Sequence, residues 1–360
     1  MRRREFLGAG GVVAAAGLGR VRRSDAEEPL RWKMVTAWPK NFPGIGTGAE
    51  FLARTIGEMS GGRLQVQVYG AGELVPAFEV FDAVSQGAAQ MGHSVSYYWQ
   101  GKNPAFHFFS ALPFGMTANE MNSWLYKGGG MELWEEAYAP FGIVPLVAGN
   151  SMVQMGGWFK REIHRLEDLQ GLRMRIPGLG GEVLRRVGVT PVVLSGKELL
   201  VALQTGVIDA TEWTGPWNDL AFGLHRAAKY YYYPGWHDPG TTLECLVNRP
   251  AFEMLPGDLQ AIVRHAAIAA NGNMMADFTA HNNDALKALV EEYGVELRQF
   301  PQEMLRVLRQ HTETVIEEVA ESDPFVRKVN DSYQAFYAQV RNWTAISEKA
   351  YLTARTAAGA

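Results

Sequence analysis

Two side chains of opposite charge follow short strands that the sequence predicts. Arg175 lies near the end of the alternating run Leu172–Ile176, just before a glycine-rich turn, and Glu212 follows a short apolar strand. An arginine at a strand end suits bidentate binding of a carboxylate. A surface salt bridge explains the same spacing equally well, and Glu212 suits either a cation or a pairing lysine. Arg173 shares a strand face with Arg175, so either arginine can face a binding cleft.

Amide and aromatic side chains are expected close to these charges. Asn150 and Gln154 follow the apolar strand 142–147 at an expected crossover, and Tyr97–Trp99 follow the strand 91–95. Amide oxygens with one carboxylate are ligands for a hard cation such as Na⁺ or Ca²⁺ rather than for zinc. The two tyrosines either wall an apolar pocket or belong to the core, and the core is the better assignment for the tryptophan.

The sequence contains no recognisable catalytic motif. Its eight histidines form neither an H-E-x-x-H pair nor a tight ligand cluster. The run Gly149–Val153 is not the G-x-S-x-G motif of serine hydrolases, and Cys245 is the only cysteine. These residues predict a binding protein rather than an enzyme.

Strands and helices alternate along the first hundred residues, which predicts an α/β architecture with largely parallel strand pairing. The expected strands are 31–39, 63–69 and 91–95, and the expected helices are 44–59 and 77–86. The run Phe81–Met91 can be aligned with Leu200–Ala210, since in both a helix ends at a glycine and an apolar strand begins at once. This internal similarity predicts two α/β lobes of similar construction.

Capping signals mark the helices around the charged pair. Ser195–Glu198 is a capping-box pattern, and the helix that it starts is expected to end at Gly206. Pro177–Gly181 predicts a turn into a helix over 182–187, with backbone amides that can hold an anion. As a dinucleotide motif this turn is incomplete, because Val183 stands where a third glycine is required.

Three long helices are expected in the last hundred residues. The first covers 256–293, with an interruption at Asn271–Asn273 that is expected to bend it, and the second covers 301–321. Asp323 and a following proline predict the start of the third helix. Its apolar positions are spaced by three and four residues, a narrow seam typical of helix-to-helix packing. The seam comprises Val326, Val329, Tyr333, Phe336, Val340 and Trp343.

The first 26 residues have the composition of an export signal. Arg3–Leu7 matches the twin-arginine pattern, and the apolar run Gly8–Gly19 is too short to span a bilayer. This leader holds six of the 34 Lys and Arg and two of the 38 Asp and Glu, so its removal leaves a net charge of −8. Such an acidic protein is not expected to bind nucleic acid. With no cysteine directly after the leader to carry a lipid, the mature protein is expected free in the periplasm.

The run from Asp168 to Trp213 resembles the solute receptors of tripartite ATP-independent periplasmic (TRAP) transporters, the DctP-like family. The resemblance extends over nearly the whole mature chain, including VFDAVSQGAAQMG and the long C-terminal helices. The stretches LVAGNSMVQMGGWF and ATEWTGPWNDL are most similar to the subgroup that binds 2-oxo acids or lactate with a metal ion.

This resemblance implies a two-lobed clamshell with a long connecting helix and extra C-terminal helices. It places the carboxylate-binding arginine at Arg175 and the metal ligands at Gln154, Glu212 and the backbone carbonyl of Trp213. Asn150 and Tyr98 are further expected ligand contacts, and the metal is expected to be Ca²⁺ or Na⁺. The expected division is a signal at 1–26, lobe I at 30–152 and 241–280, lobe II at 153–240 and 281–308, and C-terminal helices at 309–360 that form a homodimer.

The function implied is capture of a small 2-hydroxy or 2-oxo carboxylate, such as lactate or pyruvate, and its delivery to a membrane permease. Closure of the lobes around the ligand is the expected mechanism. The alternative is a metal-free receptor for a dicarboxylate or a sugar acid, which requires a second arginine in the cleft. An exported enzyme on the same fold is a further alternative without catalytic residues to support it.

Overall fold

The structure is a computed structural model that describes residues 28–357. The expected export signal lies outside these residues. Within the described part of the chain, no helix is long and apolar enough to span a membrane.

Lobe I, as we name it, is built on a five-stranded sheet in the order β2-β1-β3-β10-β4. Strands β1 to β3 pair in parallel, whereas β10 runs antiparallel to both of its neighbours. All side chains of β4 and β10 are buried, including the polar or charged Asn150, Thr242, Glu244 and Asn248. The strands are β1 (Leu30–Thr36), β2 (Leu64–Tyr69), β3 (Met91–Ser94), β4 (Ile143–Asn150) and β10 (Thr242–Asn248).

Lobe II is built on a six-stranded sheet in the order β11-β9-β5-β8-β6-β7. Its central strands are short, with two or three residues each, so the polar residues that follow them lie at the sheet edge. The strands are β5 (Gly157–Phe159), β6 (Arg173–Arg175), β7 (Thr190–Val192), β8 (Ala210–Thr211), β9 (Tyr230–Tyr233) and β11 (Glu296–Gln299).

The chain passes between the two sheets through segments 151–156 and 234–241, which connect β4 to β5 and β9 to β10. The backbone amide of Gln154 donates to the carbonyl of Asp238 at 3.1 Å, so the two crossing segments contact each other. This arrangement confirms the predicted α/β architecture with two lobes, but the strand pairing is mixed rather than largely parallel, because β10 and β5 each run antiparallel to both of their neighbours.

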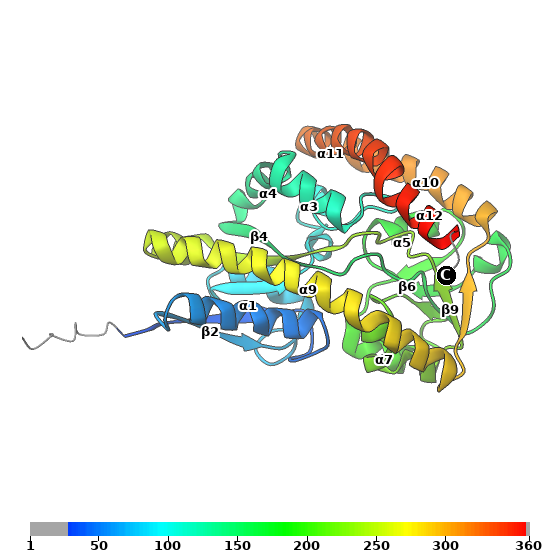
Figure 1. The fold of residues 1–360 in the computed structure, drawn as a ribbon, viewed down its shortest axis with the longest axis horizontal. Coiled ribbons are helices and arrows are strands. Elements are labelled where there is room, and N and C mark those ends of the chain that lie inside the picture. Colours follow the sequence, from blue (N-terminus) through cyan, green and yellow to red (C-terminus); the bar gives the residue numbers. More distant parts are fainter. Residues whose placement is uncertain (1–27, 358–360) are drawn as a thin grey trace, which may run out of the picture.

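The long helix α9 (Gly257–Glu291) runs beside both lobes (Figure 1). It packs on α1 (Ile45–Met59) and β4 of lobe I and on α7 (Pro216–Phe222) of lobe II. The predicted interruption at 271–273 is wrong, because the helix is continuous there. Asn271 is buried and its amide donates to Asn122 Oδ1 at 3.0 Å, and a single glycine costs a helix only about 1 kcal/mol relative to alanine.

Local signals around the charged pair are largely confirmed. Ser195 and Glu198 form the capping box, with the Ser195 amide donating to the glutamate at 2.8 Å, and the helix ends at Gly206 with φ of 76°. Helix α5 (Gly178–Arg185) begins earlier than predicted, so the glycine turn is its first turn. Close packing explains the glycines: a Cβ on Gly180 would lie 2.9 Å from the Cβ of His237.

The remaining α-helices are short, with five to ten residues each. They are α2 (Val80–Ser85), α3 (Ala118–Lys127), α4 (Gly130–Tyr138), α6 (Leu199–Thr205) and α8 (Arg249–Glu253), with the short 3₁₀ turns η2 (Ser96–Trp99) and η3 (Pro104–His107) among them.

The C-terminal helices pack on both lobes (Figure 1). Helix α10 (Gln302–Glu321) packs on α5 of lobe II, whereas α11 (Pro324–Thr344) packs on α3, α4 and η3 of lobe I. The first half of the predicted seam, from Val326 to Tyr333, is buried in this core, but Trp343 is 66% exposed. The chain continues through a π-helical turn, Ala345–Lys349, into α12 (Ala350–Ala357).

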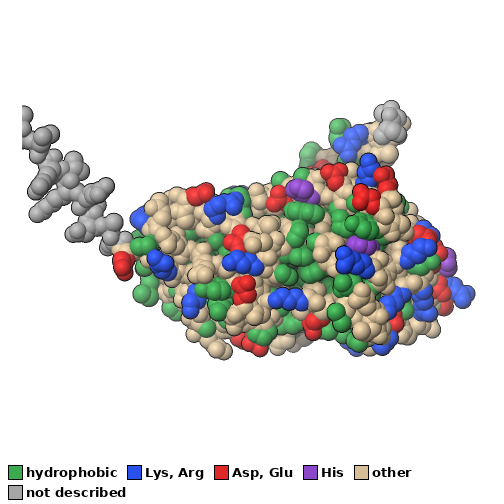
Figure 2. Space-filling model, turned by 90° about the horizontal axis from the view of Figure 1, so that it is seen from below, with side chains coloured by type: hydrophobic (Ala, Val, Ile, Leu, Met, Phe, Trp, Pro, Cys, Tyr) green, Lys and Arg blue, Asp and Glu red, His purple; other side chains and the backbone are tan. Residues whose placement is uncertain are grey.

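The face of the molecule seen in Figure 2 carries basic and acidic side chains interspersed rather than one large patch of a single sign. This face therefore shows no basic stripe of the kind that binds nucleic acid.

Candidate functional site

Arg175, the last residue of β6, is a buried cation between the two lobes. Its side chain is 1% exposed, and it forms an ion pair with the equally buried carboxylate of Glu212. The guanidinium also donates to the Leu194 carbonyl at 3.1 Å and to the Tyr98 hydroxyl at 3.2 Å. Burial by itself lowers the pKa of Arg175, but Glu212, Tyr98 and Tyr97 together outweigh this effect and the pKa is raised, so the arginine stays charged.

Arg173 is in a different environment although it shares the strand face. Its side chain is 47% exposed and binds Asp209 through two hydrogen bonds of 3.0 and 3.1 Å. Because β6 has only three residues, its first residue lies at the surface and its last lies in the interior. Arg175 therefore faces the space between the lobes and Arg173 faces solvent.

Trp213 covers the guanidinium. The ring centroid lies 4.9 Å from Arg175 Cζ, a cation–π distance, and the residue is 7% exposed. Its ring edge contacts Phe222 at the end of α7, with ring centroids 5.2 Å apart. The aromatic contact fixes the corner that carries Glu212 as well.

Gln154 presents an amide oxygen without a partner. Its Nε2 donates to Ser151 Oγ at 3.0 Å and to Thr241 Oγ1 at 3.2 Å, which fixes the orientation of the amide. Among the described residues its Oε1 has no hydrogen-bond partner, although the residue is only 5% exposed. A buried acceptor without a partner costs free energy, so a donor or a cation at this position would stabilise it.

An acid and a histidine that the sequence did not reveal lie beside Glu212. His237 Nε2 is 3.5 Å from Glu212 Oε2, and Asp238 completes a group whose ligand atoms lie within 4.8 Å of one another. Burial lowers the pKa of His237, but Glu212 and Asp238 outweigh this effect and the pKa is raised; burial raises the pKa of Asp238 to about 6. No spacing in the sequence links residue 212 to residues 237 and 238, so only the fold brings them together.

Asn150 and the aromatic triplet have distinct positions. Asn150 is fully buried, with Nδ2 donating to the Gly240 carbonyl at 3.0 Å and Oδ1 accepting from the Met152 amide at 2.8 Å. Its amide therefore holds the two crossing segments together. Tyr97 and Tyr98 line the cavity, whereas Trp99 belongs to the core, as expected, and donates to Glu244.

These groups surround a cavity with two chemically different halves. Lobe II and the crossings contribute its polar side, and lobe I contributes mainly apolar side chains. The lining residues are Trp38, Ile45, Val95, Tyr97, Tyr98, Ser151, Gln154, Arg175, Trp213, Thr214, Thr241 and Leu243.

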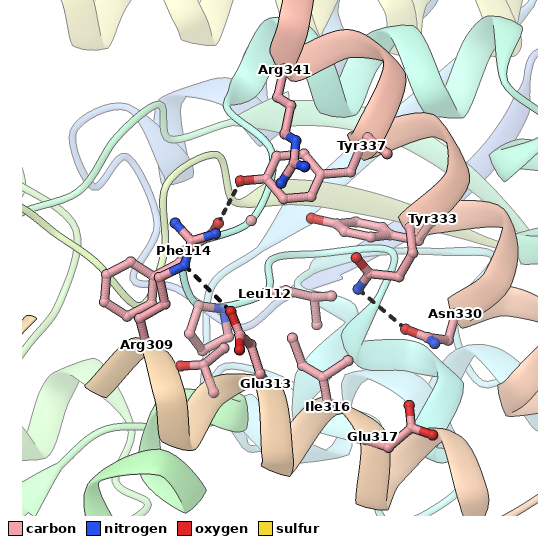
Figure 3. A pocket seen from close by; sticks show the side chains of 15 residues that line it. Leu112, Phe114, Arg309, Glu313, Ile316, Glu317, Asn330, Tyr333, Tyr337 and Arg341 are labelled. Atoms are coloured by element: carbon pink, nitrogen blue, oxygen red, sulfur yellow. Dashed lines mark hydrogen bonds and ion pairs between the residues drawn. The ribbon is translucent and has the colours of Figure 1, made fainter. Parts of the chain in front are cut away.

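A larger cavity of about 410 Å³ lies between α10, α11 and the segment 112–115 (Figure 3). Its polar groups bind one another, with Tyr337 donating to the Phe114 carbonyl at 3.0 Å and Arg309 paired with Glu313 at 3.5 Å. It therefore offers no buried charge that awaits a ligand. The cleft between the lobes is the better candidate for binding a small anion.

Two lobes joined by two crossings, with a buried cation between them, define a solute-binding protein of the clamshell class. The chain belongs to the bacterial extracellular solute-binding proteins of family 7, DctP, whose family model matches residues 34–323. Members of this family are extracytoplasmic receptors for solutes, so the protein is a receptor and not an enzyme.

Three relatives support this assignment. The chain is 41% identical, over 98% of each chain, to the monocarboxylate 2-oxoacid-binding periplasmic protein of Nostoc sp.. It is 43% identical to a TRAP periplasmic solute-binding protein from Pseudoalteromonas atlantica solved with sodium and pyruvate, with a TM-score of 0.88 over 91% of this chain and 99% of the other. A TRAP solute-binding protein from Bordetella bronchiseptica is 35% identical, with a TM-score of 0.90 over 92% of this chain and 98% of the other; it is a mixed-occupancy dimer with calcium and picolinate in one site.

Proposed function

We propose that this protein is the periplasmic receptor of a TRAP transporter and that it captures a small 2-oxo or 2-hydroxy monocarboxylate together with a Na⁺ or Ca²⁺ ion. The observation that carries the proposal is the pairing, in one buried cavity, of the Arg175 cation with the unpartnered oxygen of Gln154. The Arg175 guanidinium attracts an anion, and the Gln154 oxygen can accept a hydrogen bond or bind a cation. The relatives that bind pyruvate or 2-oxo acids support the same ligand class.

Arg175 binds the carboxylate of the ligand in this proposal. Its planar guanidinium suits two parallel hydrogen bonds, and burial strengthens them because little water competes. The Tyr98 hydroxyl, 3.2 Å from the same guanidinium, is placed to contact the ligand as well. Asn150 can contact the ligand only if its hydrogen bonds to the crossing segments break, so it is a weaker candidate than Arg175 and Tyr98.

The residues around Glu212 fit a hard cation. Gln154 Oε1, the Glu212 carboxylate and the backbone carbonyl of Trp213 would hold it, an all-oxygen set suited to Na⁺ or Ca²⁺. The bound ion supplies positive charge beside the ligand oxygens, which offsets the net negative charge of the protein. Glu212 is shared between Arg175 and His237 in this structure, and a cation on this carboxylate would leave guanidinium donors for the ligand.

The metal-free dicarboxylate receptor is less well supported. That reading requires a second arginine in the cleft, but Arg175 is the single arginine or lysine among the described residues that line the cavity. Arg173 is bound to Asp209 at the surface. The single positive charge of Arg175 therefore suits a ligand with one carboxylate, accompanied by a cation, better than a ligand with two carboxylates.

Closure of the lobes retains the ligand in this proposal, and the closed form is what the membrane permease receives. Contacts across the mouth of the cleft include Phe42 stacked on Phe222, with ring centroids 4.1 Å apart, and Asn218 donating to the Pro43 carbonyl at 2.9 Å. The twin-arginine leader would deliver the protein to the periplasm, where it is released without a lipid.

A homodimer through the C-terminal helices completes the proposal. Four large apolar side chains near the C-terminus are between 46% and 73% exposed: Trp343, Ile346, Tyr351 and Leu352. The cavity in Figure 3 lies beside the same helices and offers Phe114, Ile316 and Tyr337 as an apolar floor. The end of a second copy is the occupant that we assign to this groove, and a 35% identical relative is a dimer.

Calorimetric titration with pyruvate, lactate, longer 2-oxo acids and succinate, each with Ca²⁺, Na⁺ or chelator, tests the function. We expect a 2-oxo or 2-hydroxy monocarboxylate to bind in a cation-dependent manner, and Arg175→Ala to weaken it by at least about 100-fold, as for a lost buried charge contact. The matched control Arg173→Ala should bind like wild type. Binding that survives Arg175→Ala at wild-type affinity, or tight succinate binding in chelator, would refute the proposal.

A further inference from the structure

The apolar half of the cavity comes from one lobe. Trp38, Ile45, Val95 and Leu243 line it, and all four belong to the strands and helix of lobe I or follow them directly. The polar groups that would hold a carboxylate and a cation come from lobe II and the crossings. A ligand anchored at Arg175 therefore presents its remaining carbon chain to the lobe I wall.

Trp38 is the largest side chain of this wall, and its orientation is fixed. Its indole Nε1 donates to His93 Nδ1 at 2.8 Å, so the polar edge of the ring is already bonded. Its backbone carbonyl accepts hydrogen bonds of 2.8 Å from both the Thr36 hydroxyl and the Ala71 amide. The residue is 3% exposed, and both ends are anchored.

His93 connects this tryptophan to the neighbouring strand. Because the indole can only donate, Nδ1 of His93 must accept and Nε2 must carry the proton. Nε2 lies 3.4 Å from the carbonyl of Ala148 in β4. The histidine is fully buried in β3, and burial lowers its pKa to about 4, which keeps the ring in the neutral form that these two bonds require.

We propose that Trp38 is the specificity-determining wall that limits the length of the ligand's carbon chain, and that His93 is the positioning residue that holds this wall. The proposal rests on the function proposed above. Under this proposal the receptor prefers acids whose carbon chain beyond the 2-oxo group is short. The two hydrogen bonds of His93, to Trp38 and to the Ala148 carbonyl of β4, set this limit. Each methylene beyond the limit costs roughly tenfold or more in affinity.

Dissociation constants for pyruvate, 2-oxobutanoate and 2-oxopentanoate, measured by calorimetry with saturating Ca²⁺, test the wall. In wild type we expect affinity to fall with chain length. Trp38→Ala should change the ratio of 2-oxopentanoate to pyruvate affinity by about tenfold or more in favour of the longer acid. His93→Leu should change the ratio in the same direction, whereas His93→Gln should keep the wild-type ratio, since an amide can accept from the indole and donate to Ala148.

A matched control is His107→Leu, since His107 is also buried but lies in η3 away from the cavity. It should leave the ratio unchanged. Equal loss of affinity for all three acids in Trp38→Ala, or wild-type preference for the longest acid, would overturn the inference. If His93→Leu fails to fold, the Trp38 variant still decides it. Absence of binding of every acid to wild type would instead refute the proposed function.

Discussion

Arg175 and Glu212 neutralise each other in a cavity from which water is largely excluded. Removing either partner would leave an uncompensated buried charge, whose cost in other proteins is about 3–5 kcal/mol. When an anion and a cation bind together, the anion can pair with Arg175 and the cation with Glu212. The two side chains can then separate without leaving either charge unpaired. This balance explains why one buried arginine beside one buried glutamate favours a carboxylate with a metal ion over a carboxylate alone.

Glu244 provides a test of buried charge away from the cleft. It accepts hydrogen bonds from Trp99 at 2.6 Å and Tyr138 at 2.7 Å, and burial raises its pKa from 4.5 to about 7. Its contribution to stability is therefore fully present below pH 4.5 and is lost as the pH rises through about 7. We expect Glu244→Gln to reduce the fall in free energy of unfolding across this window by about 1.4 kcal/mol per pH unit. Urea titrations of both proteins at several pH values measure this free energy. Parallel pH profiles for wild type and Glu244→Gln would contradict the prediction.

At the scale of elements, short strands position the charged side chains of the site, and a long helix contacts both lobes. The three-residue strand β6 places Arg173 at the surface and Arg175 in the interior. Helix α9 contacts both lobes along 35 residues, so a rigid element lies beside the cleft. The ends of the strands thus position the site residues, and α9 supports the two lobes that carry them.

Gly272 tests whether α9 is continuous. It is exposed, and a Cβ at this position would meet no atom within 4 Å. Gly272→Ala should therefore raise the free energy of unfolding by about 0.5–1 kcal/mol, as expected in a regular helix. Gly206→Ala is the matched contrast: its φ of 76° disfavours a side chain, and we expect a loss of about 1 kcal/mol. Denaturant unfolding measures both. Destabilisation by Gly272→Ala would show that the helix is bent there.

At the scale of the molecule, the contacts across the mouth of the cleft should govern ligand release. Phe222→Ala removes the stack on Phe42 that joins the lobes, so we expect ligand dissociation to accelerate by about tenfold, which corresponds to roughly 1.4 kcal/mol. Stopped-flow measurement of the dissociation rate checks this. Phe51→Ala, at a half-buried phenylalanine of α1 within lobe I, is the control and should leave the rate unchanged. Equal rates for Phe222→Ala and wild type would mean that this stack does not retain the ligand.

The proposed dimer is tested at its exposed apolar end. Replacing both Trp343 and Ile346 with glutamate places charges on a surface that we assign to the interface, so the dimer should dissociate to monomers. Sedimentation velocity distinguishes the two states. Arg54→Glu, an exposed substitution on α1, should remain dimeric. A wild-type protein that is monomeric at micromolar concentration would contradict the assignment.

Much of this fold was accessible from local sequence patterns. Helix ends depend on a few neighbouring residues, which is why the capping box at Ser195 and the left-handed glycines at Gly87 and Gly206, each with φ of 76°, were predictable. Alternating strands and helices fixed the fold class, and family motifs indicated Arg175, Gln154 and Glu212. The interruption in α9 was mispredicted, since the helix runs unbroken from Gly257 to Glu291, because tertiary packing outweighs the weak propensity of one glycine.

The sequence by itself determined the elements, the acidic charge and the residue types of the site. Only the tertiary structure decided that Arg175 rather than Arg173 is buried, that His237 and Asp238 lie beside Glu212, and that His93 orients Trp38. These relations join residues from 25 to 55 positions apart through strand register and chain crossings. Spacing along the chain carries no signal for them, because burial and contact depend on how the two sheets pack together.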